Sequence, residues 1–212
     1  ALIRQGGADV IVHGAAWDEA NAKALASLDE DSAFVHPFDD PLLWTGHATM
    51  IDEAVKAGLA FDAVVLSVGG AGLLAGVAEG PQRNGLGEVP ILAVETEGTA
   101  SLAASIEARQ LVALQAVSGI ATSLGARQVS QRAFELSQTR PVESVVVSDA
   151  EAAGACIRFL DDHRVLVEPA CGAALAVAYA HADRLAAHQT VLIIVCGGAT
   201  TTVERLQAWQ EF

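Results

Sequence analysis

The chain has 212 residues, and 52% of them are hydrophobic, so it holds ample apolar material for a large buried core. A formal net charge of -14 at pH 7 argues against nucleic acid or an anionic membrane surface as a partner. Cys156, Cys171 and Cys196 show neither zinc-ligand spacing nor a disulfide framework, which fits a reducing compartment. No apolar run reaches the roughly 18 residues that a membrane-spanning helix needs, and we expect a cytoplasmic protein.

The chain opens in a way that predicts a fragment. Residues 2–7 have the pattern of the last turn of a helix that ends on glycine, and the only methionine is Met50. A helix tail by itself would have little to pack on. We therefore expect a chain that begins inside a domain, and the alternative is an intact protein with a processed N-terminus.

Strand and helix patterns alternate along the sequence. The predicted elements begin with a strand at 8–13, a helix at 17–28, a short strand at 33–36, a helix at 41–57, a strand at 63–68, a helix at 72–82, a strand at 91–95 and a helix at 100–109. They continue with a helix at 129–137, a strand at 142–147, a helix capped by Ser148, a helix at 168–181, a strand at 191–196 and a helix at 202–209. This alternation predicts an α/β fold with a mostly parallel, twisted sheet and helices on both faces.

A glycine-rich turn at residues 69–72 joins the apolar strand at 63–68 to the helix that follows. In a parallel sheet, ligands bind beyond the carboxyl ends of the strands. Such a turn leaves backbone N–H groups bare at a helix N-terminus, where the helix dipole favours an anion such as a phosphate. Glycines that only permit close packing are the plainer interpretation of this turn.

The same turn also satisfies a dinucleotide fingerprint. Gly70, Gly72 and Ala75 match the G-x-G-x-x-A form, and Glu95 ends the next strand, about where a ribose-binding acid belongs. An NAD(P)-dependent oxidoreductase is therefore a competing hypothesis.

Two further strings need an explanation. Residues 166–175 read Leu-Val-Glu-Pro-Ala-Cys-Gly-Ala-Ala-Leu, and residues 193–198 read Ile-Ile-Val-Cys-Gly-Gly. In the middle of a strand Cys196 would be a small apolar residue. At the carboxyl end of a strand, beside two glycines, it is placed to meet a ligand.

These three strings, with residues 37–41 (Pro-Phe-Asp-Asp-Pro) and 44–47 (Trp-Thr-Gly-His), resemble the serine/threonine dehydratase family of pyridoxal-phosphate enzymes, and its L-serine dehydratase branch most. The resemblance covers the chain from about Gly7 to the C-terminus. It implies a fold type II enzyme of the tryptophan synthase β kind that is incomplete at its N-terminus. Residues 1–35 would be the tail of a small domain, and residues 36–212 the large cofactor-binding domain.

The resemblance implies how the cofactor is held. The backbone N–H groups that would bind its phosphate belong to Gly69, Gly70, Ala71, Gly72 and Leu73. The family usually has four consecutive glycines there, so Ala71 is a departure; its methyl is tolerable at negative φ and harmful at positive φ. Cys196, followed by Gly197, matches the residue that faces the pyridine nitrogen.

A monovalent cation such as K⁺ is also implied beside the cofactor. Its ligands would come from the side chains of Glu95, Thr99 and Ser101 and the backbone oxygens of Gly69, Leu124 and Ala126. For Glu95 the competing interpretation is a carboxylate that only caps the next helix. Residues 121–123 match the stretch beside the bound amino acid.

The implied activity is β-elimination of L-serine, and of L-threonine, to pyruvate or 2-oxobutanoate and ammonia, a step of amino-acid catabolism, in a homodimer. The family's Schiff-base lysine lies in its N-terminal third, and neither Lys23 nor Lys56 matches that motif. We therefore expect no catalytic residue in this chain, which would form the C-terminal two thirds of the catalytic unit and be inactive alone. The alternatives are a non-catalytic, dehydratase-like binding module and a sibling enzyme such as cysteine synthase or threonine synthase.

Overall fold

The computed structural model describes residues 2–209, and its chain divides into two compact units, Ala1–Val35 and His36–Phe212. The first unit contains two helices, α1 (Leu2–Gln5) and α2 (Trp17–Leu25). None of its described residues is buried.

The two strands predicted near the N-terminus, at 8–13 and 33–36, are wrong, because these residues are irregular. The side chains of Ile11 and Val12 are 74% and 85% exposed. A strand is stable only when it pairs with neighbours and buries a face, and neither segment does so here. The helix predicted at 17–28 ends earlier, at Leu25.

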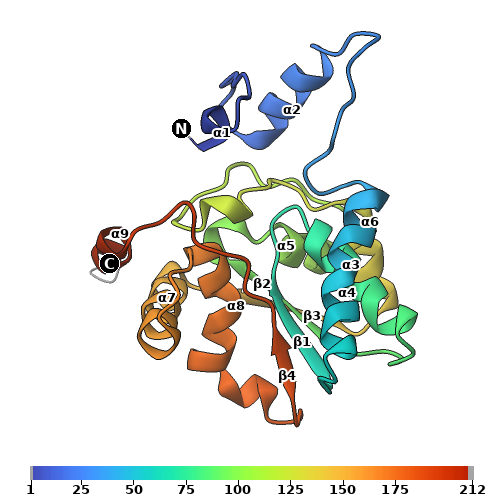
Figure 1. Cartoon of the computed structure of the whole chain (residues 1–212), viewed down its shortest axis with the longest axis vertical. Coiled ribbons are helices and arrows are strands. Elements are labelled where there is room, and N and C mark those ends of the chain that lie inside the picture. Colours follow the sequence, from blue (N-terminus) through green and yellow to red (C-terminus); the bar gives the residue numbers. More distant parts are fainter. Residues whose placement is uncertain (1, 210–212) are drawn as a thin grey trace. The chain divides into compact units, whose positions relative to one another are not determined.

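The second unit is an α/β fold built on one sheet, as the alternation predicted (Figure 1). Its strands are β1 (Ala63–Ser67), β2 (Ile91–Thr96), β3 (Val142–Val147) and β4 (Val191–Ile193). Its α-helices are α3 (Pro41–Lys56), α4 (Gly72–Arg83), α5 (Ser101–Ala108), α6 (Gln131–Thr139), α7 (Asp149–His163), α8 (Pro169–Ala180) and α9 (Val203–Trp209). Three short 3₁₀ helices complete the described elements: η1 (Glu97–Thr99), η2 (Thr122–Leu124) and η3 (Ala182–Leu185).

The four strands are parallel and lie in the order β3-β2-β1-β4. Val65 of β1 pairs with Leu92 on one side and Ile193 on the other. Strand β4 is shorter than the predicted 191–196, because after Ile193 only the Ile194 N–H still bonds to β1, at Val65 O, 2.9 Å away. Cys196 therefore lies in a loop.

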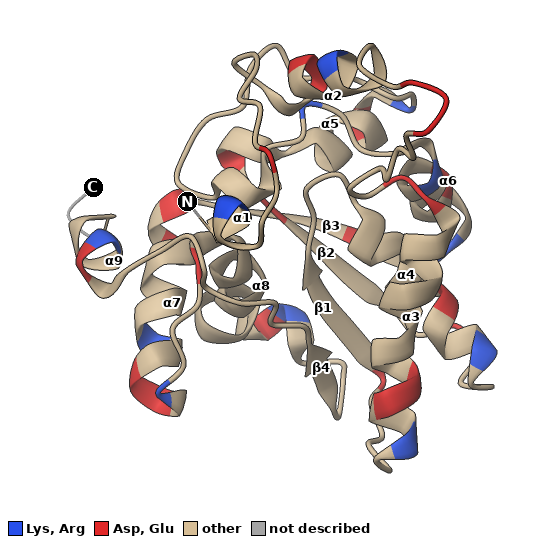
Figure 2. Ribbon diagram, turned by 45° about the horizontal axis from the view of Figure 1, so that its top comes forward, with Lys and Arg blue, Asp and Glu red and all other residues tan. Residues whose placement is uncertain are grey.

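Alternate side chains of β1 enter two hydrophobic cores, as the two-residue period of a strand requires. Ala63 and Val65 face the core formed with α7, α8 and α9, whereas Val64 and Leu66 face the core formed with α3, α4, α5 and α6. Figure 1 shows these two groups of helices on opposite faces of the sheet. Figure 2 shows that β1 and β4 contain no charged residues, whereas acidic and basic residues are concentrated on helices and loops.

Local signals fix where several helices begin. Asp40 accepts a hydrogen bond from Leu42 N at 2.8 Å and Pro41 opens α3, where a missing N–H costs nothing. Ser148 and Glu151 form a reciprocal capping box at the start of α7. Within residues 2–209, no helix combines the length and the apolarity needed to cross a membrane.

Candidate active site

The candidate site lies where β1 and β4 end. These strands are parallel neighbours, so their carboxyl ends meet at one edge of the sheet. The glycine loop, residues 69–72, follows β1, and Cys196 follows β4. Two segments that are more than 100 residues apart in the sequence thus meet at the edge where parallel sheets bind ligands.

The glycine loop presents free backbone donors. In the described part of the chain, none of the backbone N–H groups of residues 69–73 donates to another protein group. The loop is held from its other side, where Ser130 N donates to Gly70 O at 3.1 Å. Helix α4 begins at Gly72 and runs for 12 residues, so its dipole adds positive potential at the same place. Unpaired donors at a helix N-terminus fit an anionic group such as the phosphate of pyridoxal phosphate.

Ala71 has the backbone conformation that the sequence analysis identified as harmful. Its φ and ψ are 73° and 20°, in the left-handed region, directly before α4. For a residue with a Cβ this conformation costs roughly 1–2 kcal/mol. The methyl group is buried among the apolar residues around α4, so part of that cost is offset.

Phe38 explains why Gly70 and Gly72 have no side chain. A Cβ on Gly70 would lie 2.3 Å from the Phe38 ring, and one on Gly72 would lie 2.5 Å from Phe38 O. Phe38 is itself fixed, because Trp44 Nε1 donates to its carbonyl at 2.8 Å. The His36 ring also packs edge-on against the Phe38 ring, with 4.6 Å between the ring centroids. The Pro-Phe-Asp-Asp-Pro segment is thus the support of the glycine loop.

The loop that carries Cys196 is tightly packed against the N-terminus of α8. Glu168 N donates to Gly197 O at 3.0 Å, and a Cβ on Gly198 would lie 2.4 Å from Leu166 O. Cys196 is exposed, and its backbone N–H is 3.3 Å from Cys171 Sγ. The structure therefore presents the Cys196 side chain at the surface of this loop, consistent with contact to a ligand.

Glu95 is buried at the end of β2. Its Oε1 accepts from Leu102 N at 2.8 Å and its Oε2 from Ala103 N at 2.9 Å, so it caps α5. Burial raises the pKa of Glu95 to about 7, against the lowering effect of these backbone hydrogen bonds. A carboxylate that is fully buried and engaged in this way cannot reach a ribose, which removes the acidic residue that the dinucleotide interpretation needs.

The remaining predicted cation ligands follow β1 or β2 in the chain, or belong to the segment of residues 124–126 that packs against Gly69. Gly69 lies against the backbone of Leu124, since a Cβ on Gly69 would be 3.3 Å from Leu124 O. Leu124 O accepts from Ala126 N at 2.7 Å. The Thr99 hydroxyl is buried 3.0 Å from the Thr96 hydroxyl. Ser101 Oγ is buried without a hydrogen-bond partner in the described structure, which fits a missing electropositive ligand.

Lys56, the lysine of the second unit, lies away from this site. Lys56 ends α3, and Pro41 begins it beside the Phe38 segment, so about 22 Å of helix separates the two. Lys23 belongs to α2 of the first unit. Residues 121–123, predicted beside the substrate, lie at the start of η2, next to Leu124.

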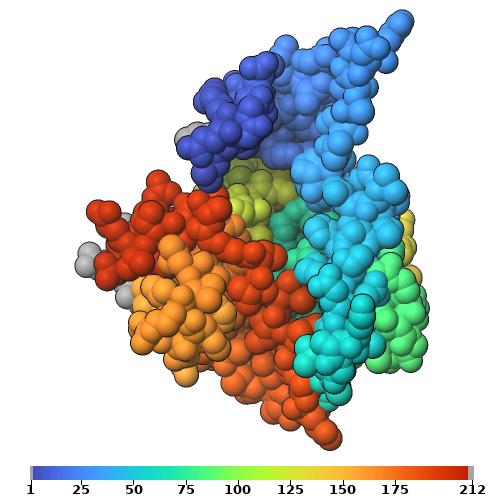
Figure 3. Space-filling view, viewed as in Figure 1, coloured from blue at the N-terminus to red at the C-terminus, as the bar shows by residue number. Residues whose placement is uncertain are grey.

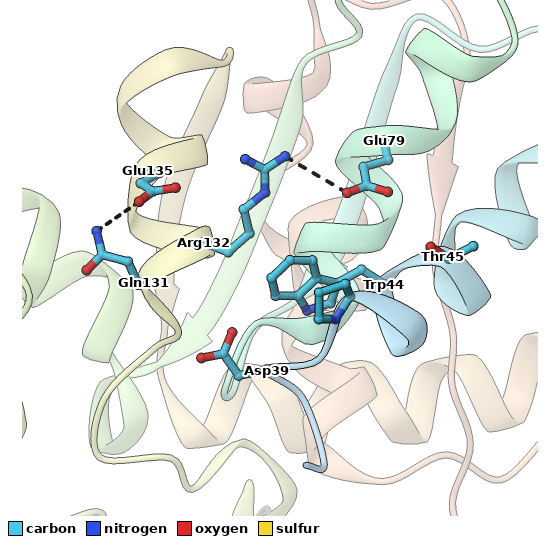
Figure 4. A pocket seen from close by; sticks show the side chains of 8 residues that line it. Asp39, Trp44, Thr45, Glu79, Gln131, Arg132 and Glu135 are labelled. Atoms are coloured by element: carbon cyan, nitrogen blue, oxygen red, sulfur yellow. Dashed lines mark hydrogen bonds and ion pairs between the residues drawn. The ribbon is translucent and has the colours of Figure 1, made fainter. Parts of the chain in front are cut away.

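A separate cavity of about 430 Å³ opens between α3, α4 and α6 (Figure 4). Arg132 extends toward Glu79, with Nη2 3.9 Å from Oε1, and Gln131 Nε2 donates to Glu135 Oε1 at 3.1 Å. None of the predicted site residues lines this cavity. It is not the site that the sequence predicted.

Sequence reasoning missed three residues of the site. Phe38 was only part of a motif, Ser130 carried no signal, and Cys171 was one of the small residues of a helix. Each acts through a contact with a residue at least 25 positions away, so no local spacing indicates it.

Comparisons with known proteins agree with this architecture. Residues 1–197 match the family model described as "Pyridoxal-phosphate dependent enzyme". The chain is 40% identical to an L-serine dehydratase of Dictyostelium discoideum over 96% of this chain and 62% of that protein. It is 41% identical to an L-serine dehydratase/L-threonine deaminase of Homo sapiens over 99% of this chain and 67% of that protein. The chain thus spans somewhat less than two thirds of the first of these relatives.

A solved structure has the same fold. A fungal L-serine ammonia-lyase from Rhizomucor miehei superposes with a TM-score of 0.90 at 35% identity, covering 99% of this chain and 69% of that one. The family match extends over most of the chain and includes the glycine loop and Cys196. The chain belongs to the pyridoxal-phosphate dependent enzyme family.

Proposed function

We propose that the chain is the C-terminal two thirds of the catalytic unit of an L-serine/L-threonine dehydratase. The reaction is β-elimination of L-serine to pyruvate and ammonia, and of L-threonine to 2-oxobutanoate and ammonia. The observation that carries the proposal is the row of five unpaired backbone N–H groups at the N-terminus of α4, with Cys196 at the end of the neighbouring strand. Relatives named L-serine dehydratase support the same reaction.

The chain's own residues would hold and orient the cofactor. The amides of residues 69–73 would bind its phosphate, and Cys196 would face its ring nitrogen. When bound, pyridoxal phosphate supplies the electron sink for removal of the α-proton and departure of the β-hydroxyl. A hydrogen bond to Cys171, together with burial, raises the pKa of Cys196, so its thiol stays neutral. A neutral thiol does not require a protonated ring nitrogen.

The cation site is part of the proposal. Glu95, Thr99, Ser101 and the backbone oxygens of Gly69, Leu124 and Ala126 would coordinate K⁺. Within residues 2–209 no group of three His, Cys, Asp or Glu side chains is suited to a metal. A hard, weakly held cation that uses hydroxyl and carbonyl oxygens therefore suits this site better than a transition metal.

The proposal assigns residues 1–35 to a small domain and residues 36–212 to the large domain. The lysine that binds the cofactor would lie outside residues 1–212, so the chain alone would be inactive. We further propose a cytoplasmic homodimer whose partner molecule is a small amino acid. Light scattering of the whole protein tests the oligomeric state.

The test uses the whole protein that contains this chain. A visible cofactor absorbance band should be present, and L-serine should yield pyruvate and ammonia in equal amounts, with D-serine as the matched control substrate. Borohydride reduction followed by peptide mapping should place the cofactor on a lysine other than Lys23 and Lys56. A band without 2-oxo acid from either L-serine or L-threonine would overturn the reaction, and the absence of a band would favour a binding module.

A further inference from the structure

The second unit brings two cysteine side chains together beside the candidate site. Cys171 belongs to the first turn of α8, and Cys196 lies in the loop after β4. Cys171 Sγ is 3.3 Å from Cys196 N and 3.2 Å from Gly197 N, both positioned to donate. Cys171 Sγ therefore lies against the backbone that carries Cys196, and the Cys196 thiol is within hydrogen-bonding reach of it.

The surroundings of Cys171 favour its thiolate. Three donors converge on the sulfur, and the N-terminus of α8 contributes a positive potential. The hydrogen bond from Cys196, ahead of the two backbone donors, lowers the pKa of Cys171 to about 6, although burial opposes this. When protonated, the same thiol donates to Gly197 O at 3.3 Å.

Two other titratable groups face the pair. The Glu168 carboxylate, at the N-cap of α8, raises the pKa of both thiols, and its Oε2 accepts from the Thr200 hydroxyl. Cys156 of α7 is fully buried, and burial raises its pKa to about 12, so it stays a thiol. The pair thus holds one proton between two sulfurs, while the third cysteine is inert.

The two sulfurs differ in access. Cys171 is 3% exposed, whereas Cys196 is exposed on the segment after β4, which lies at the surface of the second unit (Figure 3). In the resting pair Cys196 is the protonated thiol and Cys171 the thiolate, so attack by the exposed Cys196 sulfur must coincide with transfer of its proton to Cys171. Cys171 then serves as the base and as the second thiol of a disulfide.

We propose that Cys171 and Cys196 form a reversible redox modification site that hydroperoxides oxidise to a disulfide. The Cys196 thiol attacks hydrogen peroxide while its proton passes to the Cys171 thiolate, the O–O bond breaks, and Cys196 sulfenic acid, the Cys171 thiol and hydroxide form. Cys171 then attacks the sulfenic sulfur, the S–S bond forms, and the sulfenic oxygen leaves as water with the Cys171 proton. One thiol, one thiolate and one peroxide thus give one disulfide, one water and one hydroxide. The final step brings the sulfurs to about 2 Å, a movement that falls on the loop of Cys196.

Formation of this disulfide does not depend on the proposed function, but its consequence does. In the disulfide, Cys196 Sγ is drawn toward α8 and can no longer face the ring nitrogen of a bound cofactor. Oxidation should therefore weaken cofactor binding, and bound cofactor should shield Cys196 from peroxide.

The experiment treats the whole protein with hydrogen peroxide, alkylates the remaining thiols and maps the peptides by mass spectrometry. The expected result is a peptide that links Cys171 to Cys196, lighter by two hydrogen atoms than its parts, and its disappearance after reduction. The Cys171→Ser variant should lose the linked peptide completely and accumulate overoxidised Cys196. The Cys156→Ala variant, matched in depth of burial, should still form it.

The outcomes separate the two proposals. Oxidation of Cys196 without the link in wild-type protein would overturn the redox site, as would a link from Cys196 to Cys156 instead. The Cys196→Ser variant, altered in an exposed loop, is a second check and should leave Cys171 unlinked. If the link forms equally fast with and without bound pyridoxal phosphate, the redox site stands and the placement of the cofactor beside Cys196 fails.

Discussion

At the scale of single residues, the glycine loop tolerates a methyl at one position and excludes it at two others. Ala71 carries its methyl into the apolar core around α4, at the cost of a left-handed backbone. Gly70 and Gly72 face Phe38, with no space for a Cβ. The loop therefore depends less on the number of its glycines than on which of them face Phe38.

Replacement of Gly70 by alanine should disrupt the loop. The new methyl would overlap the Phe38 ring, and such overpacking costs about 1–3 kcal/mol. We expect a lower thermal midpoint and weaker binding of pyridoxal phosphate in a fluorescence titration. Gly46→Ala is the matched control, because a Cβ there meets nothing within 4 Å and alanine favours the helix. Equal midpoints and affinities for the two variants would contradict this account of Phe38.

Sequence reasoning reached the site unevenly at this scale. The glycine loop, Glu95 and Cys196 could be placed because each lies at or just beyond the end of an apolar strand, and parallel strands end at one edge. The contact between Cys171 and Cys196 could not be predicted from the sequence, since it joins a helix to a loop 25 residues later. The sign of φ at Ala71 also depends on the fold, so the sequence could only state both cases.

At the scale of elements, the strongest patterns gave the correct structure. Strands β1, β2 and β3 and helices α3, α4 and α8 end within one or two residues of the predicted limits, because long apolar periods and caps define them. Strand β4 is shorter than predicted, since the apolar run 191–196 continues beyond its pairing with β1. The apolar residues at 8–13 led to a wrong strand prediction. Whether such a segment becomes a strand depends on a neighbouring strand to pair with, which only the tertiary structure supplies.

The capping box of α7 provides a test at this scale. Ser148→Ala removes the hydroxyl that accepts from Glu151 N at 3.2 Å, so unfolding free energy should fall by about 1 kcal/mol. Urea unfolding followed by circular dichroism measures the loss. Ser148→Thr keeps a hydroxyl and should recover most of the stability; an equal loss in both variants would assign the effect to packing.

Asp62 joins the starts of β1 and β4 and should make their pairing sensitive to acid. It accepts hydrogen bonds from Gln189 N at 2.8 Å and Thr190 N at 3.0 Å, which lower its pKa below the ordinary value of 3.8. Because the folded-state pKa is the lower one, this contribution is present above the ordinary value and is lost as pH falls through the folded-state pKa.

Asp62→Asn should therefore lower the unfolding midpoint at neutral pH and approach wild type as the pH falls, which flattens the acid limb of a plot of midpoint against pH. Denaturant unfolding across that range measures the effect. Asp183→Asn changes the net charge equally at an exposed position of the same unit and should retain the wild-type slope. An unchanged slope in Asp62→Asn would show that these hydrogen bonds do not depend on ionisation.

At the scale of the whole molecule, all the buried residues among those that the structure describes lie in the second unit. Both hydrophobic cores belong to residues 36–212, and none of residues 2–35 is buried. A chain of residues 36–212 should therefore keep a cooperative thermal transition near that of residues 1–212, as followed by circular dichroism.

The control is a much shorter deletion from the other end. A chain of residues 1–202 lacks Leu206, which is fully buried in the core against α7, and loss of such a side chain costs about 2–5 kcal/mol. This chain should melt at a clearly lower temperature. If removal of the first unit were the more damaging deletion, the division of the structure into two independent units would be wrong.

The common direction of the four strands also leaves one edge of the sheet remote from the chemistry. The turn between α4 and β2 lies at that edge, where Gly85 and Gly87 have positive φ and open space around them. The five residues of β1 place about 17 Å between this edge and the glycine loop. An affinity tag or fluorophore inserted in this turn would allow the protein to be immobilised or monitored by fluorescence without altering the groups that hold its ligand.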